Sequence, residues 1–270
     1  MRITSVLASP ILTQKCGCGG EKRIYPEQWR SMIVASFGGG VNSTAMLIGM
    51  HERGERVDLI LFADTGGEKP HTYEHVLEMT EWLTDHDMPP IVTVSREVET
   101  LESDCLKRKA LPSIAYGFKS CSDHFKMRPQ RNYLKAHGIV PTVKLIGFDA
   151  GEPQRAKDIP GNRYPLIEWN WGREECVEAI TRAGLTQPGK SACFFCPSSK
   201  KPEIMELRRQ YPDLAARAVA MERNAELTTI KGLGRSFAWG DLYAADDAQA
   251  KLFPDSPIEI DCGCYDGEPA

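Results

Sequence analysis

The amino-acid sequence predicts an α/β protein built on a doubly wound parallel sheet. Short apolar runs with strand character, at residues 33–36, 57–62, 91–94 and 143–147, alternate with segments of helical character. That alternation is typical of units whose helices cover both faces of a parallel sheet. After residue 185 the sequence becomes charged and mostly helical. We therefore expect an N-terminal extension over 1–30, an α/β domain over 31–185 and a helical C-terminal region over 186–270.

Composition limits the classes of function. A chain of 270 residues that is 41% hydrophobic can bury a full core, and its net charge of −4 gives no global basic field for nucleic acid. No apolar run approaches the ~18 residues of a membrane span, and no export signal is expected at the N-terminus. Nine cysteines in a cytoplasmic protein favour metal, cluster or catalytic thiols over disulfides.

The first apolar run leads into a glycine-rich loop at the start of a helical segment. Glycines let backbone N–H groups approach phosphate oxygens, and a helix start adds unpaired donors and partial positive charge. The loop has neither the Gly-Lys-Ser/Thr of a P-loop nor the dinucleotide fingerprint. A plain strand-to-helix turn is the alternative. We predict a phosphate site made of Ser36, Gly38, Gly39, Gly40, Asn42, Ser43 and Thr44.

A second polar turn, Asp64-Thr65-Gly66, follows the apolar run at 57–62. If the two runs are neighbouring strands, both turns lie at the sheet edge where ligands of open α/β sheets bind. We predict that Asp64, Thr65 and Gly66 bind a nucleotide, with Asp64 holding Mg²⁺ or accepting from the adenine or ribose. An ordinary Asp-Thr-Gly turn is the alternative.

A pair of thiols, Cys193 and Cys196, stands in a loop before Pro197. The Cys-x-x-Cys spacing lets both sulfurs reach one metal or iron. A thioredoxin-like redox pair is disfavoured, because that motif starts a helix in a different context. A simple buried thiol pair remains the alternative.

Several motifs resemble the phosphoadenylyl-sulfate (PAPS) reductase-like family of the adenine-nucleotide α-hydrolase, or PP-loop ATP pyrophosphatase, superfamily. The stretch from Gly39 to Ser43 resembles its S-G-G-x-D-S loop, with Asn42 in the Asp position. Asp64-Thr65-Gly66, then Pro70 and Thr72-Tyr73, looks like the D-T-G-x-x-x-P-E-T-Y segment. The segment 121–129 is similar to the C-C-x-x-R-K-x-x-P segment of the iron–sulfur class, and it matches at Cys121, Lys126 and Pro129.

The resemblance implies a Rossmann-like nucleotide domain and a 4Fe–4S cluster on Cys121, Cys193 and Cys196, near the phosphate end of the nucleotide. Ser122 stands where the family has a fourth ligand, so Cys105, Cys176 or a terminal Cys-x-Cys substitutes, or one iron stays open. Zinc would accept the same thiolates. Lys126 and Lys190 would offset the charge of the cluster.

The resemblance also implies catalytic roles for Lys126 and Arg155, which would offset charge developing on the phosphates. Cys262, within Asp261-Cys262-Gly263, is similar to the family's C-terminal E-C-G-(I/L)-H tail, whose Cys attacks sulfate sulfur, although the His is missing here.

We expect an enzyme that binds ATP with Mg²⁺, cleaves it between the α- and β-phosphates, and adenylates an acceptor before sulfur transfer through the cluster. The acceptor is open among tRNA, DNA and small molecules, and a sulfur donor is implied. One alternative is reduction of adenylyl sulfate or PAPS to sulfite, with Cys262 as nucleophile and a thioredoxin-like reductant. Another is a nucleotide-binding regulator without turnover. A homodimer and the roles of the Cys16/Cys18 and Cys262/Cys264 pairs are left open.

Overall fold

The computed structural model describes residues 12–15, 21–24, 32–96, 98–112, 114–115 and 118–252. Four cysteines considered in the sequence analysis, Cys16, Cys18, Cys262 and Cys264, lie outside the described residues. Within the described part of the chain, no helix is both long and apolar enough to cross a bilayer.

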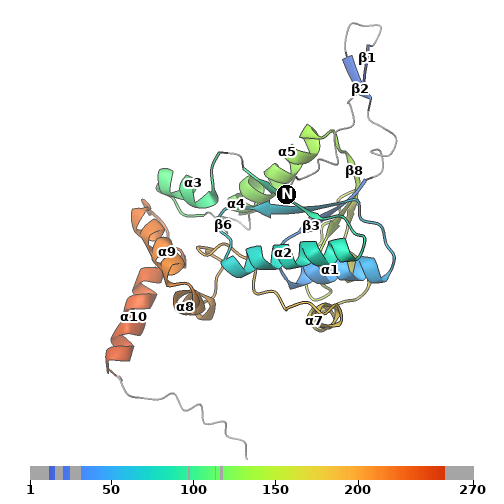
Figure 1. Cartoon of the computed structure of the whole chain (residues 1–270). Helices are drawn as coiled ribbons and strands as arrows, with labels where there is room; N and C mark the ends of the chain where they lie inside the picture. The colour runs from blue at the N-terminus through green and yellow to red at the C-terminus, as the bar shows by residue number, and fades with distance from the viewer. Residues whose placement is uncertain are drawn as a thin grey trace, which may run out of the picture.

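A five-stranded parallel sheet lies among the helices α1, α2, α5 and α7 (Figure 1). The spatial order of its strands is β5-β4-β3-β8-β9. The predicted α/β fold is therefore confirmed. The sheet consists of β3 (Met32–Phe37), β4 (Leu59–Asp64), β5 (Ile91–Ser95), β8 (Pro141–Ile146) and β9 (Asn162–Arg163).

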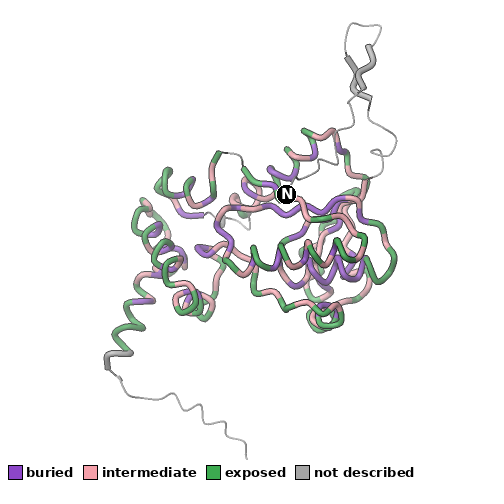
Figure 2. Tube along the Cα trace, viewed as in Figure 1, coloured by how far each residue is buried: buried purple, intermediate pink, exposed green. Residues whose placement is uncertain are grey.

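Helices cover both faces of this sheet, because successive strand residues point to opposite sides. On one face, Ala35 and Phe37 of β3 pack with the helices α1 (Val41–Glu52), α2 (Pro70–Asp85) and α7 (Arg173–Arg182). On the other face, Val34 and Leu61 pack against α5 (Arg128–Ala136) through Leu134. Figure 2 shows the buried residues concentrated along these contacts.

A second apolar core lies among the C-terminal helices α8 (Lys201–Gln210), α9 (Pro212–Asn224) and α10 (Trp239–Leu252). Phe194 and Phe195, just before Cys196, are buried in it. This core also takes in Leu101 and Cys105 from α3 (Leu101–Lys107), and Phe125 from the π-helix Asp123–Met127. The thiol loop is therefore anchored between the sheet and the helical region.

The remaining elements are short. They are β1 (Leu12–Lys15), β2 (Glu21–Ile24), β6 (Ile114–Ala115), β7 (Phe118–Lys119), α4 (Ser120–Ser122), a 3-10 turn at Pro153–Arg155 and α6 (Pro165–Glu168).

The strand order creates a crevice beside β3. The chain proceeds from β3 outward through β4 and β5, and then returns to pair β8 with the opposite side of β3. The loops that leave β3 and β8 therefore diverge at their carboxyl ends, and such switch points are where open α/β sheets bind ligands.

Candidate functional site

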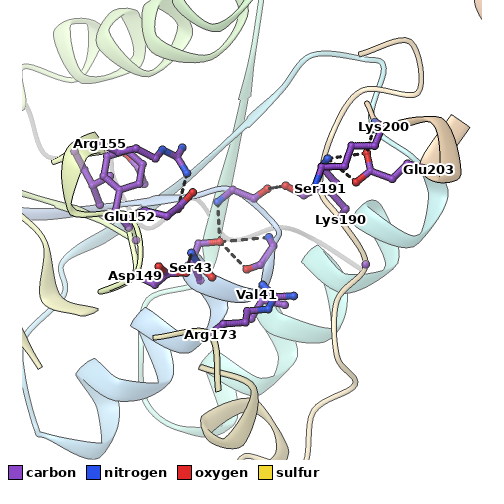
Figure 3. Close-up of a pocket in the computed structure, with 18 residues that line it drawn as sticks. Val41, Ser43, Asp149, Glu152, Arg155, Arg173, Lys190, Ser191, Lys200 and Glu203 are labelled. Carbon is purple, nitrogen blue, oxygen red and sulfur yellow. Dashed lines mark hydrogen bonds and ion pairs between the residues drawn. The ribbon is translucent and has the colours of Figure 1, made fainter. Parts of the chain in front are cut away.

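A pocket of about 710 Å³ opens at this switch point (Figure 3). Its floor is the glycine loop and the start of α1, and one wall is the segment from Ile146 to Asp149 at the end of β8. The opposite wall comes from residues 189–191, Lys200 and Glu203. The volume lies within the roughly 300–1,000 Å³ typical of small-molecule sites.

The glycine loop is held in shape by Ser43. Its hydroxyl donates to the Gly40 carbonyl oxygen at 3.0 Å and accepts from the amides of Gly38 at 3.1 Å and Gly40 at 3.4 Å. Gly39 has a φ of +71°, a conformation that favours glycine. At the end of β8, a Cβ on Gly147 would lie 3.1 Å from the backbone of Ser43, so glycine permits the close approach of β8 to α1.

The other predicted phosphate-site hydroxyls differ in placement. Ser36 lines the pocket and donates to Oε1 of Gln130 at 3.1 Å. Thr44 is fully buried, donates to the Gly40 carbonyl oxygen, and lies 2.8 Å from Nε2 of His75. The Thr44 hydroxyl therefore faces the core and fixes the first turn of α1, outside the lining of the pocket.

Asn42 stands beside a buried carboxylate that the sequence did not single out. Its Nδ2 donates to Oδ2 of Asp149 at 2.8 Å, and Asp149 also accepts from the Gly151 amide at 2.9 Å. The Oδ1 of Asn42 is buried and has no hydrogen-bond partner among the described residues. An Asp at position 42 would face Asp149 with a like charge, so the amide suits this neighbour.

Charged side chains line the walls of the pocket. Arg155 pairs with Glu152 at 2.6 Å and places its guanidinium 4.2 Å from the centre of the Phe148 ring. Lys190 contacts both carboxylate oxygens of Glu203, at 2.8 and 2.7 Å. Two further cations, Arg173 and Lys200, also line the pocket. Four cations against three carboxylates favour an anionic ligand.

The predicted turn at Asp64 lies outside the lining of this pocket. The Asp64 carboxylate accepts from the Gly66 amide at 2.8 Å and from the Tyr73 hydroxyl at 2.9 Å. Gly66 has a φ of +70°, and a Cβ there would lie 2.4 Å from Thr100. Asp64 and Gly66 thus shape a tight turn at the end of β4.

Thr65 and the residues after it hold the thiol loop. The Thr65 hydroxyl lies 3.1 Å from Sγ of Cys193. The Phe194 amide donates to the Gly67 carbonyl oxygen at 2.8 Å, and Glu68 forms an isolated antiparallel bridge with Cys193. This part of the predicted nucleotide site therefore supports the cysteines.

The three predicted ligand thiols share one neighbourhood. Cys121 and Cys193 pack against the same apolar core, and the charge on Cys196 is near enough to act on Cys121. Cys105 also belongs to this neighbourhood, whereas Cys176 is buried in the separate core beside α1. Of the two described candidates for a fourth thiol, Cys105 packs in the same core as Cys121 and Cys193, and Cys176 does not.

Lys126 lies with the thiols rather than in the pocket. Its ammonium pairs with Oε1 of Glu68 at 2.9 Å, and Glu68 lies 4.0 Å from Sγ of Cys193. Burial alone would lower the pKa of Lys126, but the carboxylate of Glu68, together with Cys193 and Cys196 when these are deprotonated, raises it overall. Lys126 is therefore a cation beside the sulfurs. Lys190, also predicted there, lines the pocket instead.

Burial governs the thiols themselves. It raises the pKa of Cys193 to about 12, and the nearby Glu68 carboxylate adds to the effect. Burial also raises the pKa of Cys121, with a further contribution from Cys196. Without a bound cation, these groups are protonated thiols at neutral pH, and a metal must displace their protons to bind.

The three thiols are of the chemical type that binds an iron–sulfur cluster. Thiolates are the ligands of iron–sulfur clusters, and Lys126 supplies positive charge next to them. A cluster takes one thiolate per iron, which spreads its ligands more widely than the ligands of a single ion. In the described part of the chain, no three or more His, Cys, Asp or Glu side chains are arranged around a single metal ion. The role of Cys121, Cys193 and Cys196 as cluster ligands stays a prediction.

Comparisons with known proteins give distant relatives. No family model matches the chain. An uncharacterized nin region protein, ORF290 of Escherichia phage lambda, is 30% identical over 155 residues, which are 48% of this chain and 52% of that protein. The uncharacterized protein MJ0066 of Methanocaldococcus jannaschii is 22% identical over 212 residues, which are 72% of this chain and 42% of that protein. The chain spans about half the length of these curated relatives, or less.

Among solved structures, the U34-tRNA thiolase NcsA from Methanococcus maripaludis with its 4Fe–4S cluster aligns with a TM-score of 0.40 and 12% sequence identity. The alignment covers 89% of this chain and 78% of that chain.

Proposed function

We propose that the chain is an ATP-using enzyme that cleaves ATP between the α- and β-phosphates and transfers AMP to an acceptor oxygen. This proposal rests on the pocket at the switch point, where the glycine loop and the N-terminus of α1 lie close to four cations: Arg155, Arg173, Lys190 and Lys200. Backbone amides, a helix start and several cations together suit a polyphosphate. The extended loop fits a pyrophosphate better than the single sulfate of adenylyl sulfate.

In the proposed reaction, the acceptor oxygen attacks the α-phosphorus of ATP, and the bond to the bridging oxygen breaks. Pyrophosphate leaves with that electron pair. The glycine-loop amides and Arg155 offset the negative charge that develops on the phosphates. AMP on the acceptor is then a good leaving group for an incoming sulfur nucleophile.

The magnesium ion that accompanies ATP would meet Asp149 in this pocket. Asp149 offers a buried carboxylate, and Asn42 offers an amide oxygen that lacks a partner among the described residues. Oxygen donors of this kind are the ligands that Mg²⁺ prefers. The Asp64 carboxylate already accepts hydrogen bonds from the Gly66 amide and the Tyr73 hydroxyl, so Asp64 would have a structural role in this scheme.

Sulfur transfer would use the neighbouring thiol site. A cluster bound by Cys121, Cys193 and Cys196 would supply an iron able to hold sulfide. Glu68 and Lys126 hold opposite charges beside Cys193, and Thr65 contacts its sulfur. These residues would orient the thiolate and balance its charge.

Calorimetric titration with ATP and Mg²⁺ tests the assignment of the pocket. We expect Arg155→Ala to weaken ATP binding about tenfold, because one charge-assisted contact to phosphate, worth roughly 1.5 kcal/mol, is lost. We expect Asp64→Asn to bind ATP within about twofold of the wild type, because Asp64 does not line the pocket. The reverse order of effects would place the nucleotide at the β4 turn.

Anaerobic purification tests the thiol site. The wild type should be brown and contain iron, and Cys193→Ala should lose both colour and iron, because a ligand of the cluster is gone. Cys176→Ala, which alters a buried thiol in the other core, should keep them. A colourless wild type with stoichiometric zinc would show that the thiols bind zinc and that sulfur transfer through a cluster is wrong.

A further inference from the structure

One short segment of the chain, Gly189–Cys196, belongs to both the pocket and the thiol site. Gly189, Lys190 and Ser191 line the pocket, and Cys193 follows after a single intervening residue. Figure 3 shows Lys190 and Ser191 on the wall opposite Arg155 and Glu152. The two candidate sites are therefore connected through a few backbone bonds.

The first half of the segment is docked on the glycine loop. The Ser191 hydroxyl donates to the Gly38 carbonyl oxygen at 2.5 Å. A Cβ on Gly40 would lie 3.5 Å from Ser191 Oγ, an ordinary contact distance, so the Ser191 side chain packs beside the glycine loop. The glycine loop lacks the Lys-Ser pair that ends a P-loop, and the fold brings Lys190 and Ser191 to it from a remote part of the sequence.

The second half is docked on the turn after β4. Cys193 is bridged to Glu68 and lies against the Thr65 hydroxyl, and Phe194 is bonded to Gly67. Phe194 and Phe195 are buried below this turn. Only Ala192 separates the docked Ser191 from the docked Cys193, so opening of the first half strains the contacts that hold Cys193.

The contacts of the first half are ones that a polyphosphate can replace. The side chains of Lys190 and Glu203 are 50% and 26% exposed, and ion pairs with that much solvent contact are weak. A phosphate group offers Lys190 more negative charge than Glu203 does, and it can accept from the Ser191 hydroxyl. Both side chains already lie at the pocket wall.

We propose that the polyphosphate of a bound nucleotide replaces Glu203 as the ion-pair partner of Lys190 and replaces the Gly38 carbonyl as the acceptor of the Ser191 hydroxyl. The segment Gly189–Cys196 then closes over Cys193. This inference rests on the proposed nucleotide-binding function and adds a coupling between its two sites. Without nucleotide, the first half is held by one exposed ion pair and one hydroxyl–carbonyl hydrogen bond. Nucleotide binding adds phosphate contacts to it, so openings that expose the Cys193 sulfur become rarer.

The test measures the rate at which N-ethylmaleimide labels Cys193 in the cluster-free full-length chain, with peptides assigned by mass spectrometry. Saturating ATP should slow labelling of the wild type at least about fivefold, whereas adenosine, which lacks phosphates, should not. Lys190→Ala and Ser191→Ala, measured at ATP concentrations that calorimetry shows to saturate each variant, should lose this protection. Lys109→Ala removes a comparable exposed Lys–Glu pair, with Glu226, away from the pocket and should behave like the wild type.

The possible results distinguish a failure of the coupling from a failure of the nucleotide site. If ATP binds by calorimetry but leaves labelling of Cys193 unchanged, the coupling is wrong and the nucleotide site stands. If both variants are protected as well as the wild type, coupling through Lys190 and Ser191 is wrong. If the wild type does not bind ATP, the proposed function fails, and this inference fails with it.

Discussion

Gly39→Ala should weaken ATP binding about 100-fold, the equivalent of losing two charged hydrogen bonds of roughly 1.5 kcal/mol each. Gly39 has a φ of +71°, and a Cβ there would lie 2.9 Å from Cγ2 of Thr72. The loop must shift to relieve this contact, and its amides then no longer converge on the phosphates. Isothermal titration calorimetry with ATP and Mg²⁺ measures the effect.

Gly54→Ala is the matched control for the backbone conformation. Gly54 has a φ of +62°, and a Cβ there would have no atom within 4 Å. Both substitutions cost roughly 1–2 kcal/mol of stability from the left-handed backbone, but only the one in the glycine loop should affect ATP affinity. Equal affinities in the two variants would contradict the role of the loop.

Glu222→Ala should destabilise the fold by about 3 kcal/mol or more, because it leaves three backbone N–H groups without their acceptor. The buried carboxylate of Glu222 in α9 accepts from Leu233 at 2.6 Å, Trp239 at 2.9 Å and Gly240 at 3.1 Å. It thus ties α9 to the loop before α10 and to the start of that helix. A Cβ on Gly232 would lie 2.3 Å from Oε2 of Glu222, so glycine is needed where the loop passes the carboxylate.

Urea unfolding followed by circular dichroism measures this loss. Glu226→Ala is the control, because the Glu226 side chain is 75% exposed and only forms a surface pair with Lys109. We expect that variant to lie within about 0.5 kcal/mol of the wild type. A similarly small loss in Glu222→Ala would show that the C-terminal helices are held together without this carboxylate.

The sheet was predictable because its strands carry strong local signals. The apolar runs at 33–36, 57–62, 91–94 and 143–147 correspond to β3, β4, β5 and β8, with ends displaced by at most a few residues. β9 was missed, because Asn162–Arg163 is a two-residue edge strand without an apolar pattern. The π-helix at Asp123–Met127 also has no signature in residue spacing.

The floor of the pocket was predictable, but its walls were not. Consecutive glycines before a helix give a local signal for an anion site, as at Gly38. Asp149 after β8, Arg173 at the start of α7 and Lys200 just before α8 reach the same pocket from separate segments. Their convergence depends on the order of the strands in the sheet, which cannot be read from the sequence. The nearest signal for Asp149 was its position two residues after the end of the fourth apolar run, the same position that Asp64 has after the second run.

The two turns at the sheet edge could not be assigned to separate sites from sequence. Both follow parallel strands, so the sequence predicted one shared nucleotide site. The structure places the pocket between β3 and β8, whereas the Asp64 turn, on the β4 side of β3, supports Cys193. Lys126 follows the same division, since its partner Glu68 belongs to the β4 turn.

The products formed from ATP show directly whether the protein cleaves ATP between the α- and β-phosphates. The protein, reconstituted anaerobically, is incubated with Mg²⁺, ATP labelled at the α-phosphate, and separate pools of tRNA, DNA and small-molecule acceptors. We expect pyrophosphate together with AMP, free or on an acceptor, and loss of both in Gly39→Ala. Formation of ADP and phosphate would contradict cleavage at the α–β bond. Tight binding of ATP without consumption in every pool would contradict the enzyme and indicate a nucleotide-binding regulator.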